Sequence, residues 1–153
     1  MRIKNPFTTH TYESEEFLDG ISVARKLNQP LEKTFKTLVA GGKSGSYYVF
    51  LIPVAMELDL KKASKSVGEK SIDLIHIKDI NRITGYIRGG CSPIGMKKQF
   101  QTIIHESAMN FETIYFSGGR LGSQIEMNPL ELVDLVSGKI DAIVVGMAAQ
   151  RRK

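Results

Sequence analysis

FKTLVAGGKSGSYYVFLIPV, residues 35–54, contains two strand-like runs separated by a glycine-rich hexapeptide. The runs KTLVA (36–40) and YYVFLIPV (47–54) are rich in β-branched and aromatic residues, and GGKSGS supplies the residue types that tight turns need. The segment therefore predicts a β-hairpin. GGKSGS also suggests a phosphate-binding P-loop, but that motif needs glycine where Thr37 stands and a helix after the loop, where a strand follows. We reject the P-loop interpretation.

Short helices are predicted on both sides of the hairpin. Asp19, Asp59 and Asn128 are helix-capping residues, and each is followed by apolar residues at helical spacing. The patterns end at residues that stop helices, namely Asn28-Gln29-Pro30, Gly68 and Gly138. We expect helices in 20–27, 60–67 and 129–137.

Further strands are predicted in 71–77, 101–105, 113–117, 123–127 and 140–145, each followed by polar or glycine residues. Most are too close together for regular βαβ crossovers, which need about ten or more connecting residues. The pattern predicts the α+β class, with a central mixed, partly barrel-like β-sheet and a few packed helices. We expect one compact domain over 1–153.

Composition and charge narrow the function classes. The chain has 153 residues, 42% of them hydrophobic, which is enough for one core. It has 21 Lys and Arg against 16 Asp and Glu, so its net charge of +5 favours partners that carry phosphate. The single cysteine cannot form an internal disulfide, and neither a charged leader nor an apolar stretch of about 18 residues is evident. We expect a cytoplasmic protein with no membrane partner.

The usual catalytic side chains are poorly represented. His10, His76 and His105 share no metal-like spacing, and there is one cysteine, so we expect no metal and no cofactor. Cys91 and His105 could form a nucleophilic pair only if the fold brought them together, and a buried, inert thiol is the favoured interpretation. No G-x-S-x-G motif occurs.

Two glycine-rich loops remain, GGCSPIG (89–95) and SGGRLG (117–122). Glycine lets backbone N–H groups approach a ligand closely, and turns built on it can form concave sites for anions or oxyanions. Either loop alone is weak evidence, because tight turns use the same residues. Lys36 adds an isolated cation at the start of an otherwise apolar strand.

Five segments in order along the chain resemble the YbaK family of Cys-tRNA deacylases, relatives of the editing domain inserted in bacterial prolyl-tRNA synthetases. They are HTYE (10–13), FKTLV (35–39), PVAMELDLKK (53–62), TGYIRGGCSPIGMKK (84–98) and TIYFSGG (113–119). The match runs over almost the whole chain, and the protein is identified as a member. The resemblance implies a compact mixed α/β domain with a partly barrel-like sheet.

The resemblance also implies site residues. The catalytic positions are Lys36, Gly89 and Gly90, and the substrate-binding positions are Tyr12, Phe17, Thr37, Ser92, Pro93, Ser117, Gly118 and Gln124. Lys97 and Lys98 can meet tRNA phosphates. Two positions depart from the family pattern: His105 stands where relatives carry Asp, and Gln124 where some carry an acidic residue. We expect neither acid to be required.

By resemblance, the protein binds the aminoacylated 3′ end of tRNA and removes cysteine from Cys-tRNA(Pro) and Cys-tRNA(Cys). Prolyl-tRNA synthetase is a candidate partner, and no DNA partner is expected. The attacking group is expected to be the substrate thiol or a water molecule, because no convincing protein nucleophile is present. Two alternatives stay open, an Ala-tRNA(Pro) deacylase of the same fold and a non-catalytic module that binds tRNA or a synthetase.

Overall fold

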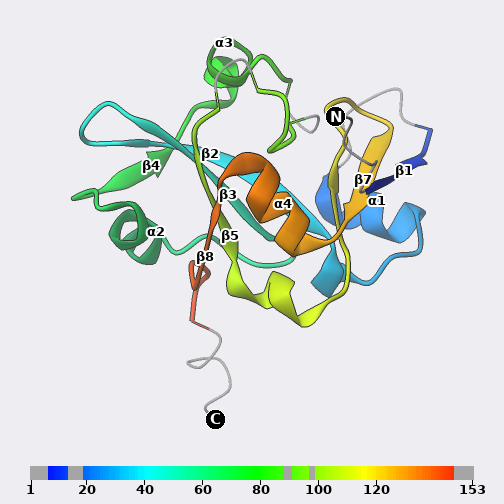
Figure 1. Ribbon diagram of the computed structural model, residues 1–153. Helices are drawn as coiled ribbons and strands as arrows, with labels where there is room; N and C mark the ends of the chain where they lie inside the picture. Colours follow the sequence, from blue (N-terminus) through cyan, green and yellow to red (C-terminus); the bar gives the residue numbers. More distant parts are fainter. Residues whose placement is uncertain (1–6, 14–18, 88–90, 97–98, 147–153) are drawn as a thin grey trace, which may run out of the picture.

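The computed structural model describes residues 7–13, 19–87, 91–96 and 99–146, which form two β-sheets and four α-helices (Figure 1). The larger sheet has the strand order β4-β2-β3-β5-β8, and the smaller has the order β1-β7-β6. The strands are β1 (Phe7–Thr11), β2 (Phe35–Gly42), β3 (Tyr47–Pro53), β4 (Ile72–Leu74), β5 (Gln101–His105), β6 (Ile114–Ser117), β7 (Ser123–Met127) and β8 (Lys139–Asp141).

The predicted hairpin forms the centre of the larger sheet. β2 and β3 pair in antiparallel register from Phe35 opposite Pro53 to Gly41 opposite Tyr47. β5 then pairs parallel with β3, and β8 pairs parallel with β5, whereas β4 pairs antiparallel with β2. The sheet is therefore mixed, and the predicted α+β class is confirmed.

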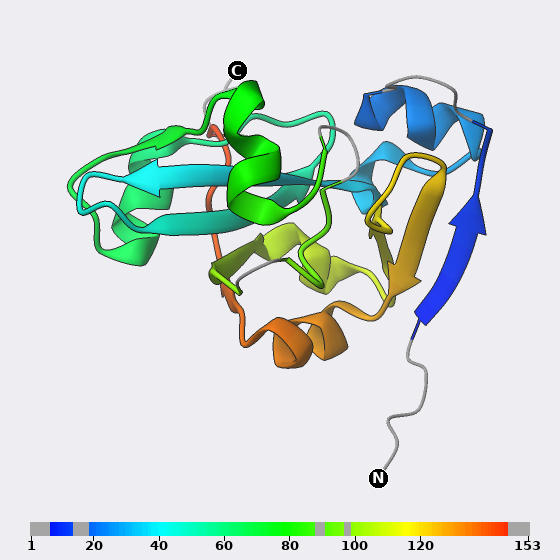
Figure 2. The same cartoon turned by 90° about the horizontal axis from the view of Figure 1, so that it is seen from above.

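The two sheets meet at the start of β2. Thr34, immediately before this strand, forms a parallel bridge with Tyr115 of β6. The smaller sheet and α1 lie at the end of the hairpin opposite its turn, and the view from above shows β1 beside β7 (Figure 2). This bridge joins the two sheets, so the predicted central sheet is in fact two sheets that meet at the start of β2.

Three of the helices follow the predicted capping pattern. The helices are α1 (Gly20–Lys26), α2 (Leu60–Val67), α3 (Ile80–Thr84) and α4 (Pro129–Val136). The side chains of Asp19, Asp59 and Asn128 accept hydrogen bonds from backbone N–H groups in the first turns of α1, α2 and α4. These bonds satisfy donors that have no partner within a helix. No helix within the described residues is long and apolar enough to cross a membrane.

Two predicted strands are shorter than expected, because their backbone groups bond elsewhere. The strand predicted in 71–77 ends at Leu74, and Asp79 N–H bonds to His76 O in the 3-10 turn that follows. The strand predicted in 140–145 ends at Asp141, since Ala142 N–H bonds to the Asp141 carboxylate and Ile143 N–H to the His105 ring. β1 and α3 were not predicted, because both are short and their sequences carry no strong periodicity.

The core lies on both faces of the larger sheet. One face, with Phe35, Val39 and Leu51, packs under α4 and the smaller sheet, and the other, with Phe50 and Ile52, packs under α2. Because side chains alternate along a strand, Lys36 lies on the α2 face of β2 and Thr37 on the opposite face. The fold thus places both predicted site residues in the centre of the molecule.

Candidate active site

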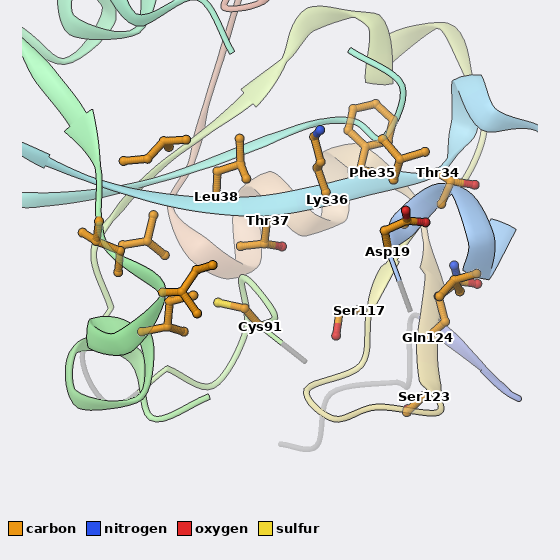
Figure 3. Close-up of a pocket in the computed structure, with 18 of the residues that line it drawn as sticks. Asp19, Thr34, Phe35, Lys36, Thr37, Leu38, Cys91, Ser117, Ser123 and Gln124 are labelled. Atoms are coloured by element: carbon orange, nitrogen blue, oxygen red, sulfur yellow. The ribbon is translucent and has the colours of Figure 1, made fainter. Parts of the chain in front are cut away.

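A cavity of about 450 Å³ opens along the first half of β2. Within the described residues, β2 has strand partners on this side at its two ends: Ala40–Gly42 pair with β4, and Thr34 bridges β6. The cavity lies in the gap between them. Its walls are mostly apolar, and its lining residues are Tyr12, Asp19, Gly20, Val23, Thr34, Phe35, Lys36, Thr37, Leu38, Val39, Val54, Leu74, Ile75, Ile77, Ile80, Cys91, Ser117, Ser123 and Gln124 (Figure 3).

Lys36 brings a half-buried ammonium group to this cavity. Burial lowers the pKa of Lys36, and the negative charges of Glu57 and Asp19 act against that shift. The lowered pKa reflects the cost of holding a cation in partly apolar surroundings. Lys36 is therefore a cation that an anionic group of a ligand would stabilise.

Thr37 lines the cavity from the other side of β2, and Figure 3 shows the two side chains pointing in opposite directions from the strand. The hydroxyl oxygen of Thr37 is buried and has no hydrogen-bond partner among the described residues. Buried polar atoms in native proteins are nearly always bonded, so an unbonded one facing a cavity indicates a ligand or water contact. Thr37 thus offers a hydroxyl to whatever occupies the cavity.

The second glycine loop forms another wall. Ser117 ends β6 and Gln124 lies in β7, and the loop is closed by the backbone bond from Gly118 N–H to Ser123 O, 2.9 Å. Tyr12 N–H donates to Gly122 O at 2.9 Å, which fixes Tyr12 beside the loop. Tyr12, Ser117 and Gln124 line the cavity, whereas Gly118 closes the loop behind it.

Gln124 is one of the two departures from the family pattern, and it is buried in the cavity wall. Its side-chain oxygen accepts a hydrogen bond from Gln29 Nε2 at 2.6 Å. The side-chain oxygen of Gln29 is itself buried, and no residue in the described part of the chain donates a hydrogen bond to it. The neutral amides of Gln29 and Gln124 thus occupy a position where an acidic residue would carry a negative charge.

The first glycine loop is described in part. Cys91 lines the cavity, while Ser92 and Pro93 are buried beside it and do not line it; Ser92 Oγ accepts a hydrogen bond from Ile94 N–H. The predicted positions Phe17, Gly89, Gly90, Lys97 and Lys98 lie outside the described residues.

Cys91 is not placed as an activated nucleophile. Burial raises the pKa of its thiol to about 11, so the thiol is neutral near pH 7. His105 is buried in β5, and its Nδ1 accepts the hydrogen bond from Ile143 N–H, which occupies that nitrogen in the core. No described contact joins the two side chains, as expected for an inert thiol. Among the residues that the structure covers, no group of three or more His, Cys, Asp or Glu side chains could hold a metal ion.

Most of the chain matches one known protein family. A family described as "Aminoacyl-tRNA editing domain" matches residues 19–135. The chain belongs to the aminoacyl-tRNA editing domain family. The matched segment includes β2, both glycine loops and every residue that lines the cavity except Tyr12.

Individual relatives agree with the family. The chain is 43% identical to "Putative Cys-tRNA(Pro)/Cys-tRNA(Cys) deacylase EbsC" of Enterococcus faecalis, over 92% of this chain and 86% of the relative. It is 23% identical to YwhH of Bacillus subtilis, over 88% of this chain and 81% of that relative. A solved structure described as "Crystal structure of a putative trans-editing enzyme for prolyl tRNA synthetase" matches with a TM-score of 0.81 and 21% identity, over 92% and 87%. The last likeness shows that the editing domain fold is shared.

The editing domain cavity also contains residues that the sequence did not single out as site residues. Asp19 was predicted as a helix cap alone, and the apolar wall from Leu74 to Ile80 was predicted in part as a strand. Ser123 had no individual signal. Asp19 could have been noted as an acidic residue close in sequence to Phe17, whereas nothing in the sequence indicates which apolar residues face a ligand.

Proposed function

We propose that this protein is a cytoplasmic, trans-acting deacylase that removes cysteine from Cys-tRNA(Pro) and Cys-tRNA(Cys). The observation that carries the proposal is the cavity along β2, which Lys36 and Thr37 line in a chain that belongs to the aminoacyl-tRNA editing domain family. Its volume of about 450 Å³ suits the aminoacyl end of a tRNA, since ligand pockets commonly span about 300–1,000 Å³. The 43% identity to a relative named for this activity supports the substrate.

Lys36 is proposed to position the terminal nucleotide electrostatically. An aminoacyl-tRNA joins the amino acid to the last ribose, next to a phosphodiester, so the site must hold a phosphate close to the reacting ester. A half-buried ammonium group would gain a compensating anion from that phosphate. Backbone N–H groups of Gly89 and Gly90 are proposed to bind the ester oxygen as negative charge develops on it, worth roughly 3 kcal/mol per donor.

The attacking group is proposed to be the thiol of the substrate cysteine. Its sulfur would bond to the ester carbonyl carbon as the bond to the ribose oxygen breaks, and the proton lost by the thiol would pass to that oxygen. The products are a four-membered thiolactone, which water then opens, and free tRNA. Ring strain opposes this route, while proximity favours it, since well-oriented groups reach effective molarities on the order of 10⁵ M. The neutral thiol of Cys91 is a poor nucleophile near pH 7, which leaves this role to the substrate thiol or to water.

The partners follow from the family. The editing domain takes an aminoacyl-tRNA as substrate. Prolyl-tRNA synthetase is proposed as a partner that would supply tRNA selectivity, and the resemblance in fold to a trans-editing enzyme for that synthetase supports this proposal. Adding the synthetase to the reaction should raise kcat/KM for Cys-tRNA(Pro) and leave that for Cys-tRNA(Cys) unchanged.

The function is tested by single-turnover deacylation of Cys-, Ser- and Ala-tRNA(Pro) with the wild-type protein. We expect Cys-tRNA to be cleared at least tenfold faster than Ser-tRNA, because the two side chains differ only by sulfur for oxygen and serine offers a weaker nucleophile. Equal rates on the two would contradict attack by the thiol and leave hydrolysis by water. Faster release of alanine would indicate an Ala-tRNA(Pro) deacylase, and no release from any tRNA would indicate a non-catalytic module.

A further inference from the structure

Two charged side chains line the described part of the cavity, and they have opposite signs. Asp19 stands just before α1, and Lys36 is the second residue of β2. Figure 3 shows the Asp19 carboxylate and the Lys36 ammonium group at the same end of the cavity. The remaining walls are apolar or neutral. A ligand therefore meets one negative and one positive group at this end.

The two charges influence each other without forming an ion pair. No salt bridge joins Asp19 to Lys36 in the part of the chain that the structure covers. Each nevertheless contributes to the electrostatic surroundings of the other. Two opposite charges held apart at a cavity mouth remain available to a ligand that carries both signs.

The carboxylate of Asp19 keeps bonding capacity. One of its oxygens, Oδ1, accepts the hydrogen bond from Ser22 N–H at 2.8 Å. That bond is the main cause of the lowered pKa of Asp19, followed by a hydrogen bond from the Ser22 side chain and by smaller contributions from the charges of Arg25 and Lys36, so the group is ionised near pH 7. Within the described residues the only donor to the Asp19 carboxylate is Ser22, and the lone pairs of two carboxylate oxygens accept more bonds than this residue supplies. Asp19 can thus accept a charge-assisted hydrogen bond from a cation in the cavity.

The proposed substrate carries the matching charges. An aminoacyl ester has a free α-amino group; the pKa of this group is about 7.7–8.0 in peptides and is lowered by the ester carbonyl, so a substantial fraction is ammonium at neutral pH. The phosphodiester on the other side of the ribose is negative. We propose that Asp19 binds the α-ammonium group of the aminoacyl ester while Lys36 faces the phosphate, so that Asp19 selects esters of free amino acids. This inference rests on the proposed function and assigns a group on the substrate to Asp19.

The test compares two stable probes that differ in the α-ammonium group alone. The first is 3′-cysteinylamino-3′-deoxyadenosine 5′-monophosphate, and the second is its 3-mercaptopropionyl counterpart, which has hydrogen in place of the α-amino group. Their affinities are measured by calorimetry at pH 6.5. We expect the wild-type protein to bind the cysteinyl probe about tenfold more tightly, a magnitude within the range of one partly exposed charge-assisted bond.

Asp19→Asn is the informative variant, because asparagine is also a good helix cap and keeps an oxygen for Ser22 N–H. We expect it to bind the two probes within twofold of each other. Asp19→Ser, another neutral cap, should behave alike. Asp59→Asn is the matched control: Asp59 caps α2 in the same way, does not line the cavity, and should retain the tenfold preference.

Two results would overturn the inference. The first is equal affinity of the wild-type protein for the two probes. The second is an Asp19→Asn protein that keeps the preference, or whose affinity for both probes falls by the same factor. That second result would indicate an effect through Lys36 or the fold. Release of cysteine from Cys-tRNA by the wild-type protein tests the proposed function separately. A wild-type protein that prefers the cysteinyl probe but releases no cysteine would contradict the proposed deacylation and not the role of Asp19 in binding.

Discussion

Lys36 occupies a position that favours function over stability. Its ammonium group is half-buried at a cavity, and burial lowers its pKa despite the nearby charges of Glu57 and Asp19. An apolar side chain would fit this part of β2 at lower cost. A buried or half-buried cation that no fold requirement explains is a common feature of functional sites.

Replacing Lys36 should abolish deacylation and leave the fold intact. We expect Lys36→Ala to reduce the single-turnover rate at least a hundredfold, since the cation that positions the phosphate is lost. Lys36→Arg should also be strongly impaired, because a planar guanidinium does not occupy the space of a compact ammonium group. Circular dichroism recorded on the same samples checks the fold. Wild-type rates in Lys36→Ala would remove Lys36 from the site.

Lys36→Met should stabilise the protein. A lysine whose pKa is lower in the folded state makes folding less favourable while it is protonated, and the penalty fades as the pH rises through the lowered pKa toward the ordinary value of 10.5. We expect the Tm to rise by roughly 2 °C at pH 7 and by less near pH 10. Lys65→Met, at an exposed position of α2, is the control and should leave the Tm unchanged. A lower Tm for Lys36→Met would contradict the argument.

Cys91 should react slowly and be dispensable for chemistry. With a pKa of about 11 against an ordinary value of 9.0, its thiolate fraction at pH 8 is about a hundredfold lower than that of an unfolded chain. Alkylation by iodoacetamide should be slowed by about that factor relative to the protein in denaturant. Cys91→Ala should keep deacylation within about tenfold of wild type. A thousandfold loss in a folded variant would restore a nucleophilic role.

At the scale of elements, the cavity exists because the edge of β2 is incompletely paired. β4 covers the end of the strand and the bridge from Thr34 to Tyr115 covers its start. The second glycine loop closes one side of the gap, and Tyr12 is tied to it through the bond to Gly122 O. The shape of the site therefore depends on a turn as much as on a strand.

Gly122→Ala should damage this turn. Gly122 has φ +87°, and a Cβ there would approach the backbone oxygen of Tyr12 to 2.9 Å, so the substitution adds strain and displaces Tyr12. We expect a loss of about 2 kcal/mol in the free energy of unfolding and at least a tenfold drop in kcat/KM. Gly68→Ala is the control, since Gly68 has φ +75° with nothing within 4 Å of the added Cβ. It should lose about 1 kcal/mol and keep its activity. Equal losses of activity would contradict a specific role for the loop.

At the scale of the whole molecule, the net charge of +5 suits a substrate with a phosphate backbone. The net charge contributes to the affinity for tRNA as a whole, whereas the cavity residues bind the aminoacyl end. These two contributions respond differently to salt, because contacts to the many phosphates of the tRNA backbone release counterions, whereas hydrogen bonds to the ester oxygens do not.

The affinity for tRNA should therefore fall as salt rises. If three phosphates are neutralised, the slope of about −0.7 per phosphate predicts roughly a 20-fold weaker Kd at 200 mM than at 50 mM salt. The double variant Lys97→Ala, Lys98→Ala should reduce the magnitude of this slope by up to the contribution of two phosphates. Fluorescence anisotropy with labelled, uncharged tRNA measures both quantities. An unchanged Kd over this range would show that the basic residues do not contact phosphate.

Local sequence signals predicted most of the elements. The turn in GGKSGS and the β-rich runs on both sides of it indicated the central hairpin, and the caps Asp19, Asp59 and Asn128 indicated three helices. These signals are local because a turn or a cap is formed by residues that are neighbours in the chain. The predicted ends of β4 and β8 were wrong because other bonds take the backbone groups there: a 3-10 turn after β4, and after β8 the Asp141 carboxylate and the distant His105 ring.

The sequence by itself determined the family, the central hairpin and the presence of Lys36 and Thr37 at its first strand. Only the tertiary structure decided that Tyr12, Ser117 and Gln124 line one cavity with them, and that Asp19 joins Lys36 there. The physical reason is that a cavity is enclosed by residues far apart in the chain. Which of them face it depends on how β-sheets, loops and helices pack, and not on any local pattern.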